Sequence, residues 1–242
     1  PQRRRRVFIM GYHQKSKLHA KSKSIEFIDL LSKEGVLANA FNIQENKRLY
    51  PSEFEIKGDL SRITQEFNKK KGFTPFQNAG VILERKVYTA KVFPDYDGQK
   101  TTLGDILIPE KDVPEEFYIN GSFEEWKYLK GAKNEKRFNK KRNISYSYDE
   151  GSMIFPDRLD SPSRTIVTGE GGSSPSRFKH VIKTKSGKLR RLTPIELERL
   201  NMFPDDHTLG RSDVKRAFFM GNALVTGVVE KIGKSLVSRI KE

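Results

Sequence analysis

The first residues of this 242-residue chain are rich in arginine. Four successive arginines, residues 3–6, run directly into Val-Phe-Ile-Met at 7–10, a pattern that favours a β-strand. Because side chains alternate along a strand, Arg4 and Arg6 are predicted to share one face and to offer forked donors to a carbonyl, a phosphate or a carboxylate. Arg3 and Arg5 then face solvent or a phosphate backbone. A solvated tail or a localisation signal is the alternative.

A second set of polar side chains surrounds a glycine-rich loop. A short strand is predicted over 164–168, and Gly-Glu-Gly-Gly-Ser-Ser-Pro-Ser follows at 169–176. Glycines let backbone amides approach base edges, and Arg177 can read a guanine bidentately in the major groove of DNA. Arg164 and Thr168 flank the loop and are candidate phosphate contacts. An ordinary surface loop is the alternative interpretation.

Several kinds of chemistry are excluded by composition. The chain contains no cysteine, which rules out disulfides, thiolate metal sites and a cysteine nucleophile within these residues. Its four histidines show no metal-ligand spacing. No apolar run approaches the length that spans a bilayer, so no membrane partner is expected. The content of Ile, Leu, Val and Phe argues against wholesale disorder.

Positive charge is clustered in three segments, and the formal net charge is +15. Residues 1–23 hold eight basic side chains and no acidic one, residues 127–142 hold eight and one, and residues 177–191 hold seven and none. The rest of the chain is net acidic. Such clustering is expected of a surface that displaces counterions from a phosphate backbone. Charge alone leaves open solvated lysines or a ribosomal or RNA-binding protein.

The helices and strands that must position these residues are predicted from the spacing of apolar residues and from glycine, proline and other turn residues. Residues 13–23 read as a polar loop, and 24–34 as a short helix that stops at Gly35. Residues 61–72 are ambiguous between helix and strand. Alternation over 80–93 predicts extended structure, with Val81 and Tyr88 on opposite faces.

The second half has sharper signals. A hairpin is expected over 181–189 around a Ser-Gly turn. Thr193, Pro194 and Glu196 predict a helix that starts with a capping box and carries Leu197 and Leu200 inward. Apolar residues at helical spacing predict an amphipathic helix over 221–240. Core packing is favoured for the lone Trp126 over stacking on a base.

Three of these segments together resemble a known family. Gln2-Arg3-Arg4-Arg5-Arg6 before Val-Phe-Ile resembles the eighth motif of C5-cytosine DNA methyltransferases, a Gln-x-Arg-x-Arg leading into a strand. Residues 191–205, Arg-Leu-Thr-Pro-Ile-Glu through Asn-Met-Phe-Pro-Asp, resemble the ninth motif, and Gly-Asn-Ala-Leu-Val at 221–225 resembles the tenth. Pro-Ser-Arg-Thr-Ile-Val-Thr at 162–168 resembles the Thr-Leu element of the family's variable target-recognition domain.

Two apolar residues depart from the family's motifs: Met202 stands where the family usually has glycine, and Leu224 stands where it usually has valine. Residues 13–150 match no motif position by position. The glycine-rich cofactor loop, the Pro-Cys nucleophile and the Glu-Asn-Val glutamate of the family all precede its eighth motif. The resemblance therefore implies an N-terminal catalytic half, as a separate subunit or a missing segment, without which this chain is inactive.

The resemblance also implies a chemistry. The target cytosine is flipped out of double-stranded DNA, a thiolate adds to C6, and C5 accepts the methyl group of S-adenosylmethionine. It further implies a restriction-modification enzyme, cytoplasmic and bacterial or phage-encoded. The expected catalytic residues are Gln2, Arg4 and Arg6. The expected DNA contacts are Arg164, Thr165, Ile166, Thr168, Ser174 and Arg177. Asn222 and Ala223, which would begin the last helix, are the expected cofactor contacts.

The predicted fold is α/β. Residues 1–12 and 206–242 are expected to belong to a Rossmann-like methyltransferase domain, as a strand and a C-terminal helix, and residues 13–205 to form a small mixed α/β target-recognition domain. Two alternatives stay open: a DNA-binding module that modifies nothing, and a basic RNA-binding protein.

Overall fold

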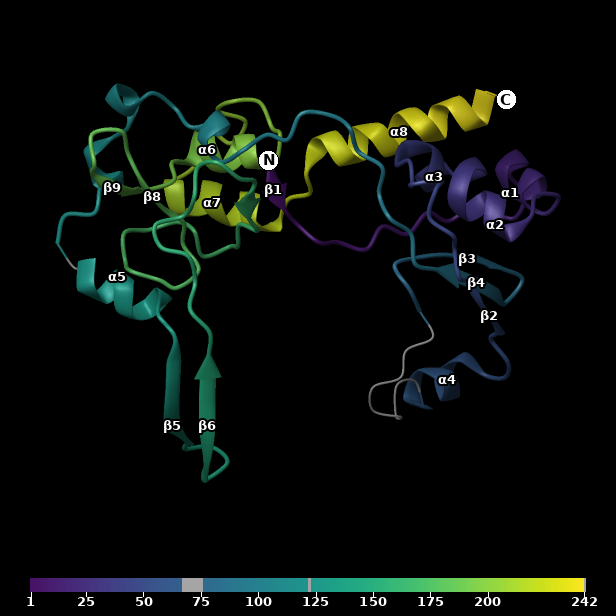
Figure 1. Cartoon of the computed structure of the whole chain (residues 1–242), viewed down its shortest axis with the longest axis horizontal. Helices are drawn as coiled ribbons and strands as arrows, with labels where there is room; N and C mark the ends of the chain where they lie inside the picture. The colour runs from purple at the N-terminus through teal and green to yellow at the C-terminus, as the bar shows by residue number, and fades with distance from the viewer. Residues whose placement is uncertain (67–75, 122, 242) are drawn as a thin grey trace. The chain divides into compact units, whose positions relative to one another are not determined.

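The computed structural model describes residues 1–66, 76–121 and 123–241. The chain is mixed α/β, as predicted, and forms two compact units (Figure 1). Unit 1 comprises Pro1–Arg6 and Gln99–Val228, and unit 2 comprises Val7–Gly98 and Val229–Glu242. The segmentation predicted at residues 12 and 205 concerns functional domains, which compactness alone does not test, so it stays a prediction. No helix within the described ranges is long and apolar enough to cross a bilayer.

Unit 2 contains a three-stranded antiparallel sheet in the order β2-β4-β3. Leu31, Tyr88 and Ala90 form the centre of its small core. Most of helix α8, Thr226–Lys241, belongs to this unit. The Ser235 hydroxyl attaches it by donating to the Val36 carbonyl, and Arg239 forms an ion pair with Glu34. Its elements are α1 Lys17–Ser22, α2 Phe27–Asp29, η1 Leu30–Glu34, α3 Val36–Ala40, β2 Ser52–Glu55, α4 Leu60–Glu66, β3 Ala79–Leu83 and β4 Lys86–Ala90.

Three predictions in unit 2 need correction. Residues 13–23, predicted as a polar loop, contain the helix α1 at Lys17–Ser22, which begins because the Ser16 side chain accepts a hydrogen bond from the His19 amide. The run over 80–93 is a hairpin, because Glu84 and Arg85 take positive φ angles of 49° and 69° and reverse the chain. Val81 therefore pairs with Tyr88 and shares its face. The helix over 24–34 begins later, at Phe27, and finishes as a π-helical turn before Gly35. In the ambiguous segment, 60–66 is the helix α4, and 67–72 lie outside the described residues.

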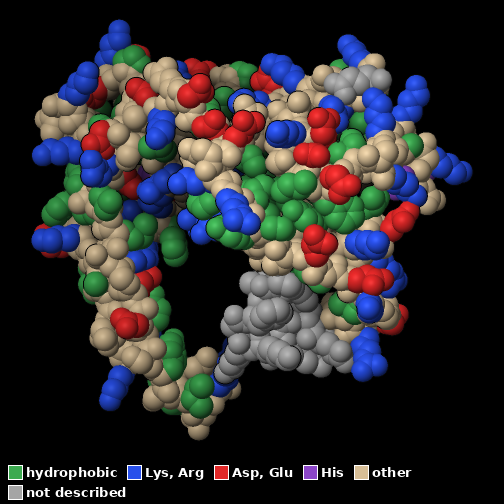
Figure 2. All heavy atoms as spheres, turned by 45° about the vertical axis from the view of Figure 1, so that its right-hand side comes forward, with side chains coloured by type: hydrophobic (Ala, Val, Ile, Leu, Met, Phe, Trp, Pro, Cys, Tyr) green, Lys and Arg blue, Asp and Glu red, His purple; other side chains and the backbone are tan. Residues whose placement is uncertain are grey.

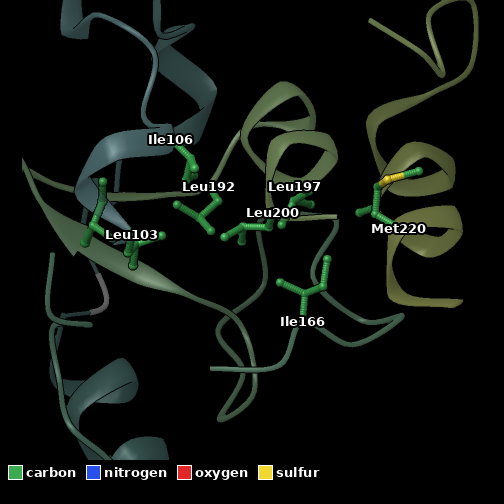
Figure 3. Close-up of a cluster of buried hydrophobic side chains, with 9 residues drawn as sticks. Leu103, Ile106, Ile166, Leu192, Leu197, Leu200 and Met220 are labelled. Carbon is green, nitrogen blue, oxygen red and sulfur yellow. The ribbon is translucent and has the colours of Figure 1, made fainter. Parts of the chain in front are cut away.

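Unit 1 is built around the ends of α6 and α7, with a core that includes Leu103, Ile166, Leu197, Leu200 and Met220 (Figure 3). Two hairpins, β5–β6 and β8–β9, and the short parallel pair β1–β7 complete it. Its elements are β1 Gln2–Arg3, η2 Gly104–Ile106, η3 Glu110–Asp112, η4 Glu115–Phe117, α5 Phe123–Lys130, β5 Lys133–Asn139, β6 Ile144–Glu150, β7 Ser163–Arg164, β8 Val181–Lys183, β9 Leu189–Arg191, α6 Pro194–Leu200 and α7 Asp213–Asn222; α8 Thr226–Lys241 begins at its end.

Local signals in unit 1 were the most dependable. The capping box of Thr193 and Glu196 is confirmed, with Pro194 in the first turn of α6. The hairpin around Ser186-Gly187 is confirmed as β8–β9. Trp126 is 1% exposed, which confirms its packing in a core.

Three boundaries in unit 1 differ from prediction. Strand β1 ends at Arg3, and Val7 and Ile9 are 85% and 89% exposed instead of forming a strand. Strand β7 ends at Arg164, because the next residues bond to β1 and to the core instead of to a ladder. The helix expected over 221–240 is confirmed from Thr226 onward as α8, but it begins later than predicted because residues 221–222 end α7 and Ala223 takes an extended conformation.

Candidate nucleic-acid interface

Gln2 connects three segments that are distant in sequence. Its Nε2 donates to the Leu200 carbonyl at 3.1 Å and to Oδ1 of Asn201 at 2.7 Å, and its Oε1 accepts from the Ile166 amide at 3.3 Å. Asn201 is fully buried, and its Nδ2 in turn donates to the Met220 carbonyl at 2.9 Å. We call these hydrogen-bonded segments, 1–4, 163–166, 200–201 and 220–221, the motif junction.

Arg4 also belongs to the motif junction. Its Nη1 donates to the Ile166 carbonyl at 3.0 Å and its Nη2 to the Gly221 carbonyl at 2.8 Å. Burial, followed by the nearby Arg6, lowers the pKa of Arg4 below its ordinary value. The expectation that Arg4 and Arg6 share a strand face is wrong because β1 has already ended, and both terminal nitrogens of Arg4 are engaged within the chain. Arg6 is exposed and bonds only to the neighbouring Arg5 carbonyl among the described residues.

The segment after β7 is held from inside the protein. The Ile166 side chain is 1% exposed and lies in the core, so it does not present a free surface for the DNA contact predicted at this position, which stays a prediction. Thr165 donates its hydroxyl to the Arg3 carbonyl at 2.6 Å. Arg164 pairs through Nε with Asp157 at 2.8 Å and donates from Nη1 to the Phe178 carbonyl at 2.6 Å, so it is not the free phosphate contact expected.

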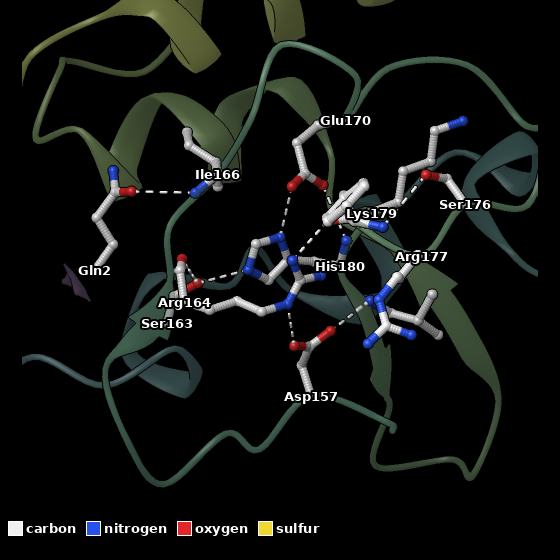
Figure 4. Close-up of polar contacts among 12 residues, drawn as sticks. Gln2, Asp157, Ser163, Arg164, Ile166, Glu170, Ser176, Arg177, Lys179 and His180 are labelled. Atoms are coloured by element: carbon white, nitrogen blue, oxygen red, sulfur yellow. Dashed lines mark hydrogen bonds and ion pairs between the residues drawn. The ribbon is translucent and has the colours of Figure 1, made fainter. Parts of the chain in front are cut away.

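A buried polar chain lies beneath the glycine-rich loop (Figure 4). His180 is fully buried, with Nε2 2.9 Å from the Ser163 hydroxyl and Nδ1 2.8 Å from Glu170. The second oxygen of Glu170 accepts from the His180 amide at 2.9 Å. Because Ser163 is 3% exposed, this serine, histidine and glutamate stabilise the loop and offer no accessible nucleophile.

Arg177 does not present the free guanidinium edge that was expected. Its Nη1 donates to the carbonyls of Leu129 and Gly131, its Nη2 to that of Gly151, and its Nε pairs with Glu150 at 2.7 Å. All three nitrogens are engaged within unit 1. Reading a guanine would require these contacts to break, which corrects the predicted geometry.

The loop itself has a defined shape and an exposed crest. Lys179 donates from Nζ to the carbonyls of Gly172 and Ser174, at 3.0 and 2.6 Å. The Ser173 and Ser174 side chains are exposed, as is Phe178, at 55%. Thr168 is also exposed, and its backbone packs against Gly221, where a Cβ would lie 2.5 Å from the Thr168 Cα.

Asn222 and Ala223 end a helix instead of beginning one. The Nδ2 of Asn222 donates to the Phe218 carbonyl at 3.1 Å, and Ala223 is the C-cap of α7. The free amides expected at these positions are therefore absent, since the chain here exposes the carbonyl end of a helix. Asn222 is exposed, so its Oδ1 can accept a hydrogen bond from an external donor.

Sequence reasoning missed three ionic residues that support this surface: the buried Lys130 and Glu170, and the partly buried Asp157. One signal was present, because Glu170 is the only acidic residue between Asp160 and Glu196. Lys130 is 1% exposed and donates to the carbonyls of Arg177 and Lys179 at 3.2 and 2.6 Å. Desolvation lowers its pKa to about 8.

Burial divides the basic clusters. In the 177–191 cluster, Lys179, Arg190 and Arg191 are buried and Arg177 is engaged, which leaves three exposed lysines, Lys183, Lys185 and Lys188. In the 127–142 cluster, Lys130 and Lys133 are buried and Lys127 is exposed on α5, while the other exposed cations, Lys136, Lys140, Lys141 and Arg142, lie on the β5–β6 hairpin. Among the described residues, no group of acidic side chains and histidines is arranged to hold a metal.

Comparisons with known sequences identify the family of this chain. The model of the C-5 cytosine-specific DNA methylase family matches residues 1–238, and the chain belongs to this family. It is 36% identical over 238 residues to the Type II methyltransferase M.Sau3AI of Staphylococcus aureus, an alignment that covers 97% of this chain and 55% of that protein. The chain thus spans about half the length of this relative. The solved structure of the methyltransferase EhMeth of Entamoeba histolytica aligns with 80% of this chain and 55% of its own, at 12% identity and a TM-score of 0.36.

Proposed function

We propose that this chain is the target-recognition and C-terminal portion of a DNA (cytosine-5)-methyltransferase of a bacterial restriction-modification system, acting in the cytoplasm. It would recognise a specific site in double-stranded DNA and support methyl transfer to C5 of a flipped cytosine. The supporting observation is the motif junction. There Gln2 and Arg4 bond directly to the Thr-Ile element and to the ends of α6 and α7.

The proposal includes a catalytic half on the N-terminal side of these residues. Attack on C6 needs a thiolate, and these 242 residues contain no cysteine. The proposed half therefore supplies the nucleophile and most of the site for S-adenosylmethionine, which provides the methyl group. Within this chain we assign cofactor contact to Asn222, through its exposed Oδ1, and to Ala223 beside it. We also propose that residues 1–12 and 206–242 are parts of a Rossmann-like catalytic domain.

The contacts found here suggest a division of labour among the candidate residues. Arg6, Thr168 and Ser174 are exposed, and we assign direct DNA contacts to them. Arg6 would contact the flipped cytosine or its phosphate, Thr168 the DNA backbone, and Ser174 a base edge. The remaining candidates are bonded within unit 1, and we assign them to positioning: Gln2, Arg4, Arg164, Thr165, Ile166 and Arg177.

Reconstitution tests the proposal. This chain is mixed with the proposed catalytic half, labelled S-adenosylmethionine and duplex DNA containing cytosine. We expect label in DNA from the mixture and none from this chain alone. Duplex binding without label from the mixture would indicate a non-enzymatic module, and preference for RNA would indicate an RNA-binding protein; either result rejects the proposed function.

Two variants of the reconstituted enzyme test the division of labour. Arg6→Ala is expected to slow methylation of every accepted site equally, because the flipped base is always cytosine. Ser174→Ala is expected to change discrimination at one base pair. Rates across a panel of single-base site variants distinguish the two, and a change of site preference in Arg6→Ala alone would reverse the assignment.

A further inference from the structure

We propose that the β5–β6 hairpin is a DNA-binding ribbon and that Lys140, Lys141 and Arg142 at its tip contact the phosphate backbone. This inference rests on the proposed function and names the part of unit 1, besides the glycine-rich loop, that holds the duplex. The sequence marked residues 127–142 only as a basic cluster, and the structure shows that its distal part forms the tip of a hairpin.

The geometry of the hairpin suits a groove. Seven residues of β5 pair with seven of β6, from Lys133 opposite Glu150 to Asn139 opposite Ile144. The turn is closed by Asn139, whose Oδ1 accepts from the Arg142 amide at 3.1 Å, and by Asn143 at a positive φ of 51°. The ribbon projects from the rest of unit 1 (Figure 1). The major groove of B-DNA admits a two-stranded ribbon of this kind.

Charge is separated along the ribbon. The distal segment, 136–147, holds five cations and no carboxylate. The three acidic residues of the hairpin, Glu135, Asp149 and Glu150, are all at its base. Glu150 is occupied there by Lys133 at 3.4 Å and by Arg177 at 2.7 Å. Of the five cations, Arg137 pairs with Glu135 at 3.1 Å. Lys140, Lys141 and Arg142 are exposed at the tip, in a segment without carboxylates, and this positive charge selects a polyanionic partner.

Side chains between the cations add contact surface. Phe138, Ile144 and Tyr146 are 55%, 49% and 43% exposed, and Figure 2 shows hydrophobic and Lys or Arg side chains together on this narrow limb. On the face of Phe138, cross-strand register also places the exposed Lys136, Ser145 and Ser147. Apolar and hydroxyl groups beside cations match the thymine methyl, base edges and phosphates of a groove.

The ribbon is also firmly held. Arg137 lies over the Tyr148 ring, 3.5 Å from its centroid, and pairs with Glu135. At the base, Arg177 binds the carbonyls of Leu129 and Gly151, and so ties the hairpin to the glycine-rich loop. Both proposed DNA-contacting elements are thus presented by one unit in a fixed relationship, which reduces the ordering cost of binding.

Binding of duplex DNA by this chain tests the inference. Lys140→Ala, Lys141→Ala and Arg142→Ala are combined, and affinity is measured by fluorescence anisotropy from low to physiological salt. Loss of three phosphate contacts should weaken binding on the order of 10- to 100-fold at physiological salt and make the log–log salt slope shallower by about 2–3. The matched control removes the same charge from dispersed exposed lysines, Lys47, Lys100 and Lys111, and should change both values far less.

A second measurement does not depend on affinity. Because the chain has no cysteine, Lys141→Cys introduces a unique site for a photo-crosslinker, with Lys111→Cys as the control. The reaction contains duplex DNA and the proposed catalytic half, and we expect crosslinks to the DNA from position 141 only. Circular dichroism checks that each variant is folded.

Two outcomes would overturn the inference: wild-type affinity and salt slope in the triple variant, or a position-141 probe that labels the catalytic half instead of DNA. Its failure is distinguishable from failure of the proposed function. If the reconstituted enzyme methylates DNA while the triple variant binds normally, only the hairpin assignment fails. If the triple variant loses DNA binding but the wild-type mixture never methylates, the hairpin assignment stands and the enzyme assignment fails.

Discussion

The side-chain amide of Gln2 donates a hydrogen bond of 2.7 Å to Oδ1 of Asn201, although 199 residues separate them. Asn201 is fully buried, and its own side-chain amide donates onward to the Met220 carbonyl. The first strand, the end of α6 and the end of α7 are therefore linked through two amide side chains. Since a buried amide left unpaired is costly, each side chain depends on the other.

We expect this dependence to be measurable as coupling. Gln2→Ala and Asn201→Ala should each lower the free energy of unfolding by about 1–3 kcal/mol, because each leaves a polar partner unsatisfied. In the double variant, the losses should differ from additivity by about 0.5–3 kcal/mol. Fluorescence of the lone Trp126, which is buried in unit 1, reports unfolding in urea. Additivity within about 0.5 kcal/mol would show that the two residues do not act together.

Gly221 is predicted to tolerate no side chain. A Cβ here would lie 2.5 Å from both the Thr168 Cα and the Val167 carbonyl carbon, and backbone cannot give way as a flexible side chain does. Gly221→Ala should destabilise unit 1 by several kcal/mol. The control is Gly233→Ala in α8, where a Cβ meets nothing within 4 Å; it should be neutral or stabilising by up to about 1 kcal/mol. Equal effects from both substitutions would contradict the close approach.

Arg177→Ala should destabilise the protein before it alters specificity. The substitution leaves the carbonyls of Leu129 and Gly151 and the carboxylate of Glu150 without their cation, a loss of roughly 2–4 kcal/mol in urea unfolding. Lys183→Ala, which removes an exposed cation nearby, should be close to neutral. Unchanged stability together with relaxed reading of one base pair would restore Arg177 as a base reader.

The lowered pKa of Lys130 predicts that the free energy of unfolding rises at alkaline pH. Desolvation lowers its pKa from 10.5 to about 8 in the folded protein, so between pH 8 and 10.5 the unfolded chain binds more protons than the folded one. The free energy of unfolding attributable to Lys130 should therefore increase with pH across this window, by about 3 kcal/mol in total. Urea unfolding of wild type and Lys130→Met from pH 7.5 to 10 isolates this contribution. A constant difference between the two proteins would show that Lys130 titrates normally.

The sequence correctly predicted those features that depend only on residues a few positions apart in the chain. Thr193 and Glu196 close their capping box within one turn, and the Ser186-Gly187 turn reverses the chain within a few residues. The motif resemblance to the methyltransferase family was likewise contained in the order of short segments, and the family match over 1–238 confirms it.

What the sequence could not determine was which charged side chains are free. Arg177 and Lys183 look alike in a basic segment, yet only tertiary packing bonds the first to the carbonyls of Leu129 and Gly151. Arg4 was assigned to a strand face because alternation is a local rule, whereas its partners, Ile166 and Gly221, lie more than 160 residues away. The sequence by itself determined the family, the caps and the clustering of charge, because these depend on residue type and spacing. Only the tertiary structure decided which cations satisfy buried carbonyls and which, such as Lys141, face solvent, because desolvation depends on neighbours brought together by the fold.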